Sequence, residues 1–386
     1  MDLHAKYPAL SDLRARARRR VPRFAWDYLD SGTGTEATTR RNRTMLDRVL
    51  FLPSILHGEI ASDPSCQFLG QSLPIPVGMA PVGMSGLVWP DAERLLARAA
   101  TQAGLPYTLS TVASQTPETI GREVKGKGWF QLYPPRDIEI RKDMLKRARS
   151  SGFDTLVLTA DVPVASRRER QVRTGLRQPP VLTLRMLAQC ALCPAWSLGT
   201  ALNGMPTMRT LEAYNSDTTR RDPTAHVGYM LRTSPDPHYV RWLRDHWQGP
   251  LVVKGVLKPS DAQYLQAEGV DAIWISNHSG RQFDAAPASI EALAAIRPVT
   301  DLPLIVDGGF EGGLDILRAL AFGANLVMMG RPFHAALAAL GAQGPAHLID
   351  ILRKDMIANM GQLGAETLQD IVGKALWDQG APILQQ

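Results

Sequence analysis

The segment ISNHSGRQFD, residues 275–284, carries two side chains whose types and spacing suit removal of a proton from an anionic molecule. His278 supplies an imidazole, the side chain that titrates nearest to neutral pH and therefore a natural general base. Arg281 follows three residues later, and its planar guanidinium matches a carboxylate in a way that a lysine would not reproduce. A histidine taken alone is more often a packed side chain than a catalytic one. The prediction therefore depends on which other functional side chains the fold brings close to His278.

Asp161 is the predicted partner of the imidazole, because a carboxylate can orient the ring and stabilise its protonated form. It follows the apolar run TLVLT at 155–159, far from His278 along the chain. The fold must therefore bring the ends of two distant segments together.

The elements that could do so are eight short β-rich apolar runs, most of them followed by a stretch with a helical pattern. TLVLT and LIVD (304–307) are nearly unbroken apolar runs, as expected of parallel strands covered on both faces. Amphipathic stretches of helical length lie between the runs, for example at 91–103 and 312–322. Eight alternations predict a closed (β/α)8 (TIM) barrel rather than an open sheet. The predicted strands are 75–79, 107–110, 129–133, 155–159, 251–254, 272–276, 304–307 and 326–330.

Polar or glycine residues follow every one of these runs. In a (β/α)8 barrel the carboxyl ends of the strands meet at one mouth, where active sites lie, so these residues are predicted to share one cavity. Strand ends are commonly polar for structural reasons, but all eight carry such residues here. They are Ala80-Pro81, Ser110-Thr111, Gln131 with Tyr133, Thr159 with Asp161, Lys254, Ser276-Asn277-His278, Asp307-Gly308-Gly309 and Gly330-Arg331.

The last two strand ends indicate a phosphate site. Gly308-Gly309 and Gly330-Arg331 follow strands seven and eight, where barrels often bind phosphate through backbone N–H groups and a helix N-terminus. A monophosphorylated cofactor is therefore predicted. Each glycine pair alone could equally serve an ordinary tight turn.

Composition sets the remaining limits. The net charge of +6 fits an anionic ligand or membrane surface, and the basic run at 14–23 lacks the interleaved aromatics and motifs of a nucleic-acid site, so no nucleic-acid partner is predicted. Three cysteines are too few and too odd in number for a disulfide framework, and no metal site is predicted from them. The first twenty residues are charged throughout without an apolar core, which predicts no signal peptide and a cytoplasmic protein.

The order of these motifs resembles the FMN-dependent family that oxidises L-2-hydroxy acids, which includes glycolate oxidase and the lactate and mandelate dehydrogenases. The similarity spans almost the whole chain. It implies one domain over 1–386 with an N-terminal helical extension before the barrel, FMN as cofactor and a small anionic 2-hydroxy acid as substrate. The matching segments are FAWDYLDSG (24–32), MAPVGMSGL (79–87), WFQLY (129–133), LTADVP (158–163), VVKGV (252–256), ISNHSGRQFD (275–284), DGG (307–309) and MGRP (329–332).

The resemblance also implies roles for particular residues. The catalytic residues would be His278, Asp161, Tyr133 and Lys254, with Lys254 stabilising the negative charge of reduced flavin. The substrate would be bound by Tyr28, Tyr133, Arg168 and Arg281, although Arg168 could belong to a merely basic loop and either tyrosine could be a packing residue. The cofactor would be bound by Pro81, Val82, Gly83, Ser110, Gln131, Thr159, Lys254, Ser276, Asp307, Gly308, Gly309, Gly330 and Arg331.

Two positions depart from the family pattern. The family usually has an arginine two residues after DGG as a further phosphate partner, whereas this chain has Glu311. A carboxylate beside a phosphate is repulsive unless it turns away, so Glu311→Arg is predicted to tighten FMN binding. Ser279 replaces the more usual glycine after the base. A non-redox phosphate-binding barrel is the alternative that Glu311 favours.

A long insertion, about 170–240, separates the fourth and fifth predicted strands. Residues 186–208 contain no charge and include Trp196, with arginines on either side, which predicts an interfacial membrane contact or an apolar lid. Docking on the inner face of the cytoplasmic membrane favours a quinone or cytochrome as electron acceptor, whereas a lid favours a soluble oxidase that reduces O2 to H2O2. Gly83 favours the dehydrogenase, since oxidases of the family often have alanine there, and the resemblance implies a homo-oligomer, a tetramer.

Overall fold

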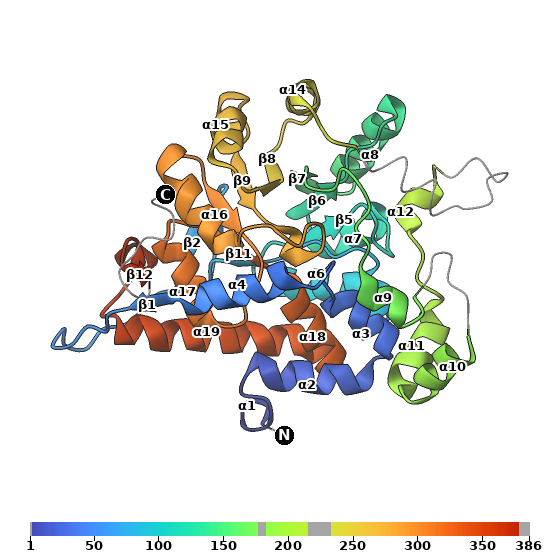
Figure 1. Ribbon diagram of the computed structural model, residues 1–386, viewed down its shortest axis with the longest axis horizontal. Helices are drawn as coiled ribbons and strands as arrows, with labels where there is room; N and C mark the ends of the chain where they lie inside the picture. Colours follow the sequence, from blue (N-terminus) through green and yellow to red (C-terminus); the bar gives the residue numbers. More distant parts are fainter. Residues whose placement is uncertain (1, 177–182, 215–232, 378–386) are drawn as a thin grey trace.

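The computed structural model describes residues 2–176, 183–214 and 233–377, and its centre is a barrel of eight parallel strands (Figure 1). The predicted strands are all present within a few residues of their expected bounds. Their side chains are almost all buried, which explains the continuous apolar runs. The strands are β4 Val77–Met79, β5 Thr108–Ser110, β6 Gly128–Leu132, β7 Phe153–Thr159, β8 Leu251–Val256, β9 Ala272–Ile275, β10 Leu304–Val306 and β11 Leu326–Met329.

The strand order closes the sheet on itself. Neighbours run β4-β11-β10-β9-β8-β7-β6-β5, and a parallel bridge between Met79 and Tyr107 joins the first strand to the last. Met79 N also donates to Pro106 O at 2.9 Å across this seam. The (β/α)8 barrel predicted from the sequence is thus confirmed.

The barrel interior is filled by side chains rather than open. Trp129, Trp274 and Met328 belong to this inner cluster, and Phe68 stacks on Trp129 with ring centroids 6.0 Å apart. Phe68 comes from a small hairpin of β2 Cys66–Phe68 and β3 Gln71–Leu73. Since the interior is packed, a ligand can enter only at the rim of the barrel.

Helices surround the barrel. Several begin at a side chain that accepts a backbone N–H, such as Thr116, Asp137 and Asp236, which satisfies donors of the first turn. The helices are α5 Ser85–Val88, α6 Ala92–Gln102, α7 Pro117–Val124, α8 Ile138–Ser150, α14 Pro237–His246, α15 Pro259–Ala267, α16 Ser289–Ile296, α17 Gly313–Ala321, α18 Arg331–Leu340 and α19 Gly344–Gln362, with 3-10 turns η1 His278–Gly280, η2 Arg297–Val299, η3 Gly341–Gln343 and η4 Leu368–Ile371.

The span Arg331–Gln362, which holds α18 and α19, is long and apolar enough by length and composition to cross a membrane. However, 56% of its most apolar window is buried inside the protein, and both helices pack against other elements of the fold. This is the pattern of core helices.

The predicted N-terminal helical extension is α1 Leu3–Lys6, α2 Leu10–Arg20, α3 Arg23–Asp30 and α4 Ala37–Asp47. Helix α2 packs along α18, where the alanines of α18 permit close approach. Arg16 Nε donates to Ala339 O at 2.8 Å near the carboxyl end of α18, where a cation is favourable. Part of the basic run at 14–23 is therefore used inside the protein. Near the C-terminus, β12 Ala375–Trp377 pairs with β1 Val49–Phe51.

The insertion between β7 and β8 contains α9 Glu169–Arg173, α10 Leu184–Ala191, α11 Pro194–Asn203 and α12 Arg209–Glu212. Helices α10 and α11 form a projection beside α3, at the lower right of Figure 1. Trp196 is not part of its outer surface, because its indole is buried, donates to Leu87 O at 3.1 Å and meets Phe24 edge-on. This tryptophan fixes the insertion to the rest of the protein. Arg177, one of the flanking arginines, lies outside the described residues.

Candidate active site

The carboxyl ends of the strands surround a cavity of about 440 Å³, within the usual size range of ligand sites. Residues from β4 to β11 and from the N-terminal helices line it. Sixteen of the nineteen predicted site residues lie in its wall: Tyr28, Pro81, Val82, Gly83, Gln131, Tyr133, Thr159, Arg168, Lys254, His278, Arg281, Asp307, Gly308, Gly309, Gly330 and Arg331.

The other three lie behind this wall, in contact with residues that form it. Asp161 is within hydrogen-bond distance of His278. Ser110 Oγ donates to Gln131 Oε1 at 2.9 Å, and Ser276 Oγ accepts from Lys254 Nζ at 2.8 Å. The sequence predicts direct cofactor contacts for both serines, which stay predictions, and the structure shows that each serine also orients a neighbouring side chain.

His278 reaches the cavity from a turn with an uncommon backbone. His278, Ser279 and Gly280 have φ angles of 54°, 52° and 74°, all left-handed, and such a conformation is costly for the two residues that are not glycine. The imidazole Nδ1 lies 3.2 and 3.1 Å from the two carboxylate oxygens of Asp161. The turn thus presents an imidazole whose orientation a carboxylate fixes.

The protonation of this pair follows from burial and charge. Burial raises the pKa of Asp161, but attraction by His278 and Lys254 outweighs burial, so the pKa lies below the ordinary value. Burial lowers the pKa of His278 below its ordinary value, and Asp161 offsets only part of this shift. An ionised carboxylate only accepts hydrogen bonds, so Nδ1 carries the ring proton and Nε2 has a free lone pair at neutral pH.

Gly255 makes room for the carboxylate, and sequence reasoning missed it. It lies at an irregularity between β8 and β9, with φ at 103°. A Cβ atom there would lie 2.5 Å from Asp161 Cβ, closer than real atoms approach. The glycine in VVKGV was a visible signal, but only the fold shows which side chain it faces.

We predict that Gly255→Ala displaces Asp161, slows flavin reduction and destabilises the protein by about 1–3 kcal/mol, the cost of backbone strain. Gly269→Ala is the matched control, because Gly269 also has a positive φ of 73° but no atom near its Cβ position. Stopped-flow reduction and thermal unfolding of both variants test this prediction. Equal reduction rates in the two variants would remove Gly255 from the support of Asp161.

Lys254 stands at the end of β8 in a buried polar network. Its ammonium lies 3.3 Å from Asp307 Oδ2 and donates to Ser276, while Asp307 also accepts from Trp274 Nε1 at 3.0 Å. A buried charge is costly unless it is paired and hydrogen-bonded, and these contacts meet that requirement. The ammonium is therefore a fixed positive charge in the cavity wall.

Arg281 and Arg331 both bind the carboxyl end of α3. Arg281 Nη1 donates to the carbonyls of Tyr28, Leu29 and Ser31 at 2.7, 3.1 and 3.2 Å. Arg331 donates to Leu29 O at 3.0 Å through Nε and to Ser31 O at 2.9 Å through Nη2. These carbonyls lack partners within the helix, so the two cations cap it and tie the N-terminal extension to the barrel mouth.

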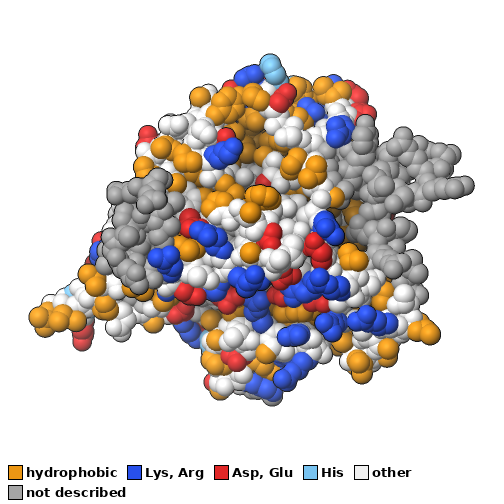
Figure 2. Space-filling view, in the orientation of Figure 1, with side chains coloured by type: hydrophobic (Ala, Val, Ile, Leu, Met, Phe, Trp, Pro, Cys, Tyr) orange, Lys and Arg blue, Asp and Glu red, His pale blue; other side chains and the backbone are white. Residues whose placement is uncertain are grey.

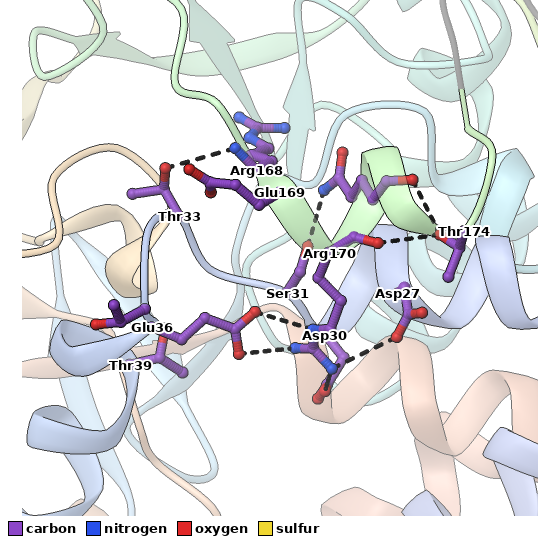
Figure 3. Close-up of polar contacts among 12 residues, drawn as sticks. Asp27, Asp30, Ser31, Thr33, Glu36, Thr39, Arg168, Glu169, Arg170 and Thr174 are labelled. Carbon is purple, nitrogen blue, oxygen red and sulfur yellow. Dashed lines mark hydrogen bonds and ion pairs between the residues drawn. The ribbon is translucent and has the colours of Figure 1, made fainter.

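Three arginines of the cavity wall form no ion pair with another described residue. They are Arg168, Arg281 and Arg331. Burial, followed by repulsion from Arg168 and Arg331, lowers the pKa of Arg281. Arg168 has a left-handed backbone, with its amide near the Thr33 hydroxyl and its Nε 3.0 Å from Ser166 Oγ (Figure 3). Such a wall favours anions.

Two tyrosines complete the cavity wall near the base. Tyr28 donates through its hydroxyl to Gly83 O at 2.8 Å, and Tyr133 is half-buried beside the arginines. Burial, then the nearby Asp161 charge, raises the pKa of Tyr133, so its phenol stays protonated and able to donate. A Cβ at Gly83 would lie 2.5 Å from Val112 Cγ2, so this glycine keeps the cavity open.

The residues of the wall fit FMN. Gln131 Nε2 and Thr159 Oγ1 are buried polar atoms that have no partner in the described structure, and each could serve a polar ring or ribityl group. Gly308 and Gly309 have φ angles of 101° and 87°, which only glycine adopts readily, and side chains there would collide with Asn42. Their turn leads past the mouth to α17, and Gly330 begins α18, so backbone N–H groups and Arg331 gather where a phosphate would bind.

Asn42 is a further residue that sequence reasoning missed. Its side-chain amide exchanges two hydrogen bonds with that of Asn277, at 3.0 and 2.7 Å, directly before the base. Asn42 belongs to α4, and nothing in its local sequence distinguishes it from a surface asparagine. Only the docking of α4 on the barrel reveals the pair.

A (β/α)8 barrel with glycine turns after its last two strands and a carboxylate-held histidine at its mouth is typical of enzymes that bind a phosphorylated cofactor. Residues 17–378 match the model of the FMN-dependent dehydrogenase family. The chain belongs to this family, and FMN is its cofactor.

Similar proteins agree with this assignment. The chain is 39% identical over 368 residues to an L-lactate dehydrogenase of Xanthobacter autotrophicus, covering 94% of both chains. It is 37% identical over 377 residues to an L-lactate dehydrogenase of Pectobacterium atrosepticum, covering 95% of this chain and 96% of that protein. A solved structure of the monotopic membrane protein (S)-mandelate dehydrogenase superposes with a TM-score of 0.89 at 32% identity, covering 96% of this chain and 99% of that one.

The direction of the His278 pKa shift leads to a prediction about pH. If the neutral imidazole acts as the base, its pKa below the ordinary 6.5 means that activity should persist to lower pH than a free histidine would allow. We predict that kcat/KM, which reports the free enzyme, falls on an acid limb centred below pH 6.5. An acid limb centred above that value would contradict the burial argument.

Proposed function

We propose that this FMN-dependent dehydrogenase oxidises a small L-2-hydroxy acid to the 2-oxo acid, with His278 as the base. The observation that carries the proposal is the Nδ1 contact with Asp161 at 3.1 Å, which leaves Nε2 as an acceptor. The cavity around it is lined by Arg168, Arg281 and Arg331, none of which has an ion-pair partner among the described residues. The relatives named L-lactate dehydrogenase and (S)-mandelate dehydrogenase support this substrate class.

The substrate carboxylate binds Arg281 and Arg168, with the Tyr133 hydroxyl as a further donor. The Tyr28 hydroxyl becomes a donor to the substrate when its proton turns away from Gly83 O. Arg281 Nη1 is occupied by backbone carbonyls, whereas no described residue accepts from its Nε or Nη2. Those two nitrogens provide the fork for a carboxylate. The fixed carboxylate places the substrate's C2 carbon next to the base.

Oxidation removes two protons and two electrons from the substrate's C2–O unit. His278 Nε2 takes one proton, and Asp161 stabilises the imidazolium that results. Bound FMN supplies the acceptor for the electron pair, with the second hydrogen nucleus. The Lys254 ammonium is a fixed charge that favours negative charge on the reduced cofactor, and Pro81, Val82, Gly83, Gln131 and Thr159 line its place.

The proposal is tested by mixing the purified, FMN-loaded protein anaerobically with L-lactate, (S)-mandelate and longer L-2-hydroxy acids. At least one should bleach the oxidised flavin band, while the opposite enantiomers should not. A flavin that stays oxidised with every L-2-hydroxy acid would contradict the substrate class.

His278→Gln should keep the flavin bound and yellow but slow its reduction by about 100-fold or more, the usual contribution of a general base. Gln retains hydrogen bonding and volume without the basic nitrogen. A variant with the wild-type reduction rate would exclude His278 as the base.

We also propose that the protein docks on the inner face of the cytoplasmic membrane through α10 and α11 and passes electrons to a quinone or cytochrome there. Leu184, Leu192, Leu198 and Leu202 are 86%, 80%, 64% and 78% exposed, an unusual density of apolar surface. Figure 2 shows hydrophobic side chains in this lower right region next to Lys and Arg side chains. The structurally similar (S)-mandelate dehydrogenase is a monotopic membrane protein, which supports the proposal. One domain over 1–386 and a homo-oligomer stay predictions.

Replacing Leu198 and Leu202 with glutamate should release the protein from membranes without detergent. Each lost leucine contact is worth about 1.5–3 kcal/mol, so partitioning should fall by tenfold or more. Leu52→Glu is the matched control, since Leu52 is 75% exposed and directly follows β1, which lies on the opposite side of the molecule from α10 and α11 in Figure 1. Equal partitioning of the variants in a vesicle sedimentation assay would favour the lid, as would stoichiometric H2O2 release on turnover.

A further inference from the structure

Glu311, which follows the Gly308-Gly309 turn, forms an ion pair with Arg14. Its carboxylate accepts from Arg14 Nη1 at 2.5 Å, while Arg14 Nη2 donates to Asp30 Oδ1 at 2.7 Å. Arg14 belongs to α2, almost three hundred residues away along the chain, and its side chain is about one third exposed. It lines the same cavity as Gly308, Gly309 and Arg331.

A chain of alternating charges continues from Arg14 around the mouth. Asp30 accepts from Arg170 Nη1 at 2.9 Å, and Arg170 also holds Glu36 through Nε at 2.9 Å. Figure 3 shows Arg170 between Glu36 on one side and Asp30 and Asp27 on the other. Arg14 itself is held from two sides, by Asp30 of α3 and by Glu311 of the loop after β10.

The arginines near the predicted phosphate end of the cavity differ in how many N–H donors remain free to bind a ligand. Arg43 makes five bonds, to Asp47, Asp315 and Gly309 O, which uses all the donors of a guanidinium. Arg170 uses four in bonds to acidic side chains. In bonds to the described residues Arg14 uses two of its five, so it can hold both carboxylates and still donate to a ligand.

Neighbouring arginines also repel Arg331. Burial lowers the pKa of Arg331 to about 10, Asp30 partly offsets this, and Arg14 and Arg170 lower it further. Guanidinium groups that repel one another are stabilised when an anion binds between them. A phosphate carries that charge together with acceptor oxygens for the free donors.

We propose that Arg14 supplies a cationic partner for the phosphate of FMN, and that Glu311 serves as a positioning residue that holds Arg14 at this end of the cavity. The inference rests on FMN as the resident cofactor. It assigns to the N-terminal helix α2 a part in cofactor retention, and it gives the carboxylate at position 311 a use other than repulsion.

Binding of FMN and of riboflavin to the apoprotein, followed by flavin fluorescence, tests the proposal without any turnover. Arg14→Gln should weaken FMN binding by about tenfold, the value of one charge-assisted hydrogen bond, and leave riboflavin affinity unchanged. Unchanged riboflavin affinity also shows that the variant is folded. Equal losses for both ligands, or no loss for FMN, would overturn the proposal.

Arg18→Gln is the matched control. Arg18 is exposed and lies one turn further along α2, and its substitution removes the same charge as Arg14→Gln. It should change FMN affinity by less than about twofold. Arg40→Gln tests whether another arginine could bind the phosphate instead. Arg40 also lines the cavity, and within the described residues its side chain donates one hydrogen bond, to Thr35 O. A selective FMN loss in Arg40→Gln or Arg18→Gln of the size expected for Arg14→Gln would also overturn it.

Glu311→Gln distinguishes two possible effects of the carboxylate on FMN binding, namely positioning of Arg14 and repulsion of the phosphate. If Glu311 holds Arg14, the variant should bind FMN a few-fold more weakly, by less than Arg14→Gln because Asp30 still holds the guanidinium. Tighter FMN binding would show that the carboxylate acts by repulsion and would overturn its positioning role. Wild-type apoprotein that takes up no FMN would instead refute the FMN-dependent function itself.

Discussion

The contact between the His278 imidazole and the Asp161 carboxylate is the interaction on which the account of this site depends. It joins the ends of β9 and β7, and it requires a left-handed backbone at His278 and a glycine at position 255. Such a backbone is unfavourable, and it persists only where the surrounding structure determines it. The outcome is a buried imidazole that stays neutral and is oriented for proton transfer.

The N-terminal extension contributes to the mouth as much as the barrel does. Arg281 and Arg331 hold the carboxyl end of α3, and the Asn42–Asn277 pair holds α4 against the turn that carries the base. Each arginine thus has two tasks, since the donors not used on α3 remain in the cavity. Loss of the extension would remove both the cap of α3 and part of the cavity wall.

Much of this arrangement could be predicted from the sequence. The eight strands are visible because both faces of a parallel strand are buried, and the shared mouth follows from barrel topology alone. Sixteen of the predicted site residues therefore line one cavity, although their roles stay proposals. The hydrogen bonds of Ser110 to Gln131 and of Ser276 to Lys254 could not be predicted. In a sequence, a serine at a strand end looks the same whether or not it bonds a neighbouring side chain.

The residues that were missed are those whose meaning depends on docking between distant elements. Asn42 and Arg14 lie on helices with ordinary polar surfaces, and only the packing of those helices brings them to the mouth. Trp196 shows a similar limit, since the uncharged segment around it predicts a membrane contact or a lid but does not indicate that the indole packs inward and anchors the insertion. Local patterns identify elements, but they do not identify partners across the fold.

A crystal structure of the protein with FMN and a bound 2-oxo acid product tests the central claim most directly. The account predicts that the 2-oxygen lies within hydrogen-bond distance of His278 Nε2, with Asp161 on Nδ1 and the product carboxylate on Arg281. An imidazole turned away from the flavin, or a carboxylate bound elsewhere than at Arg281, would contradict it.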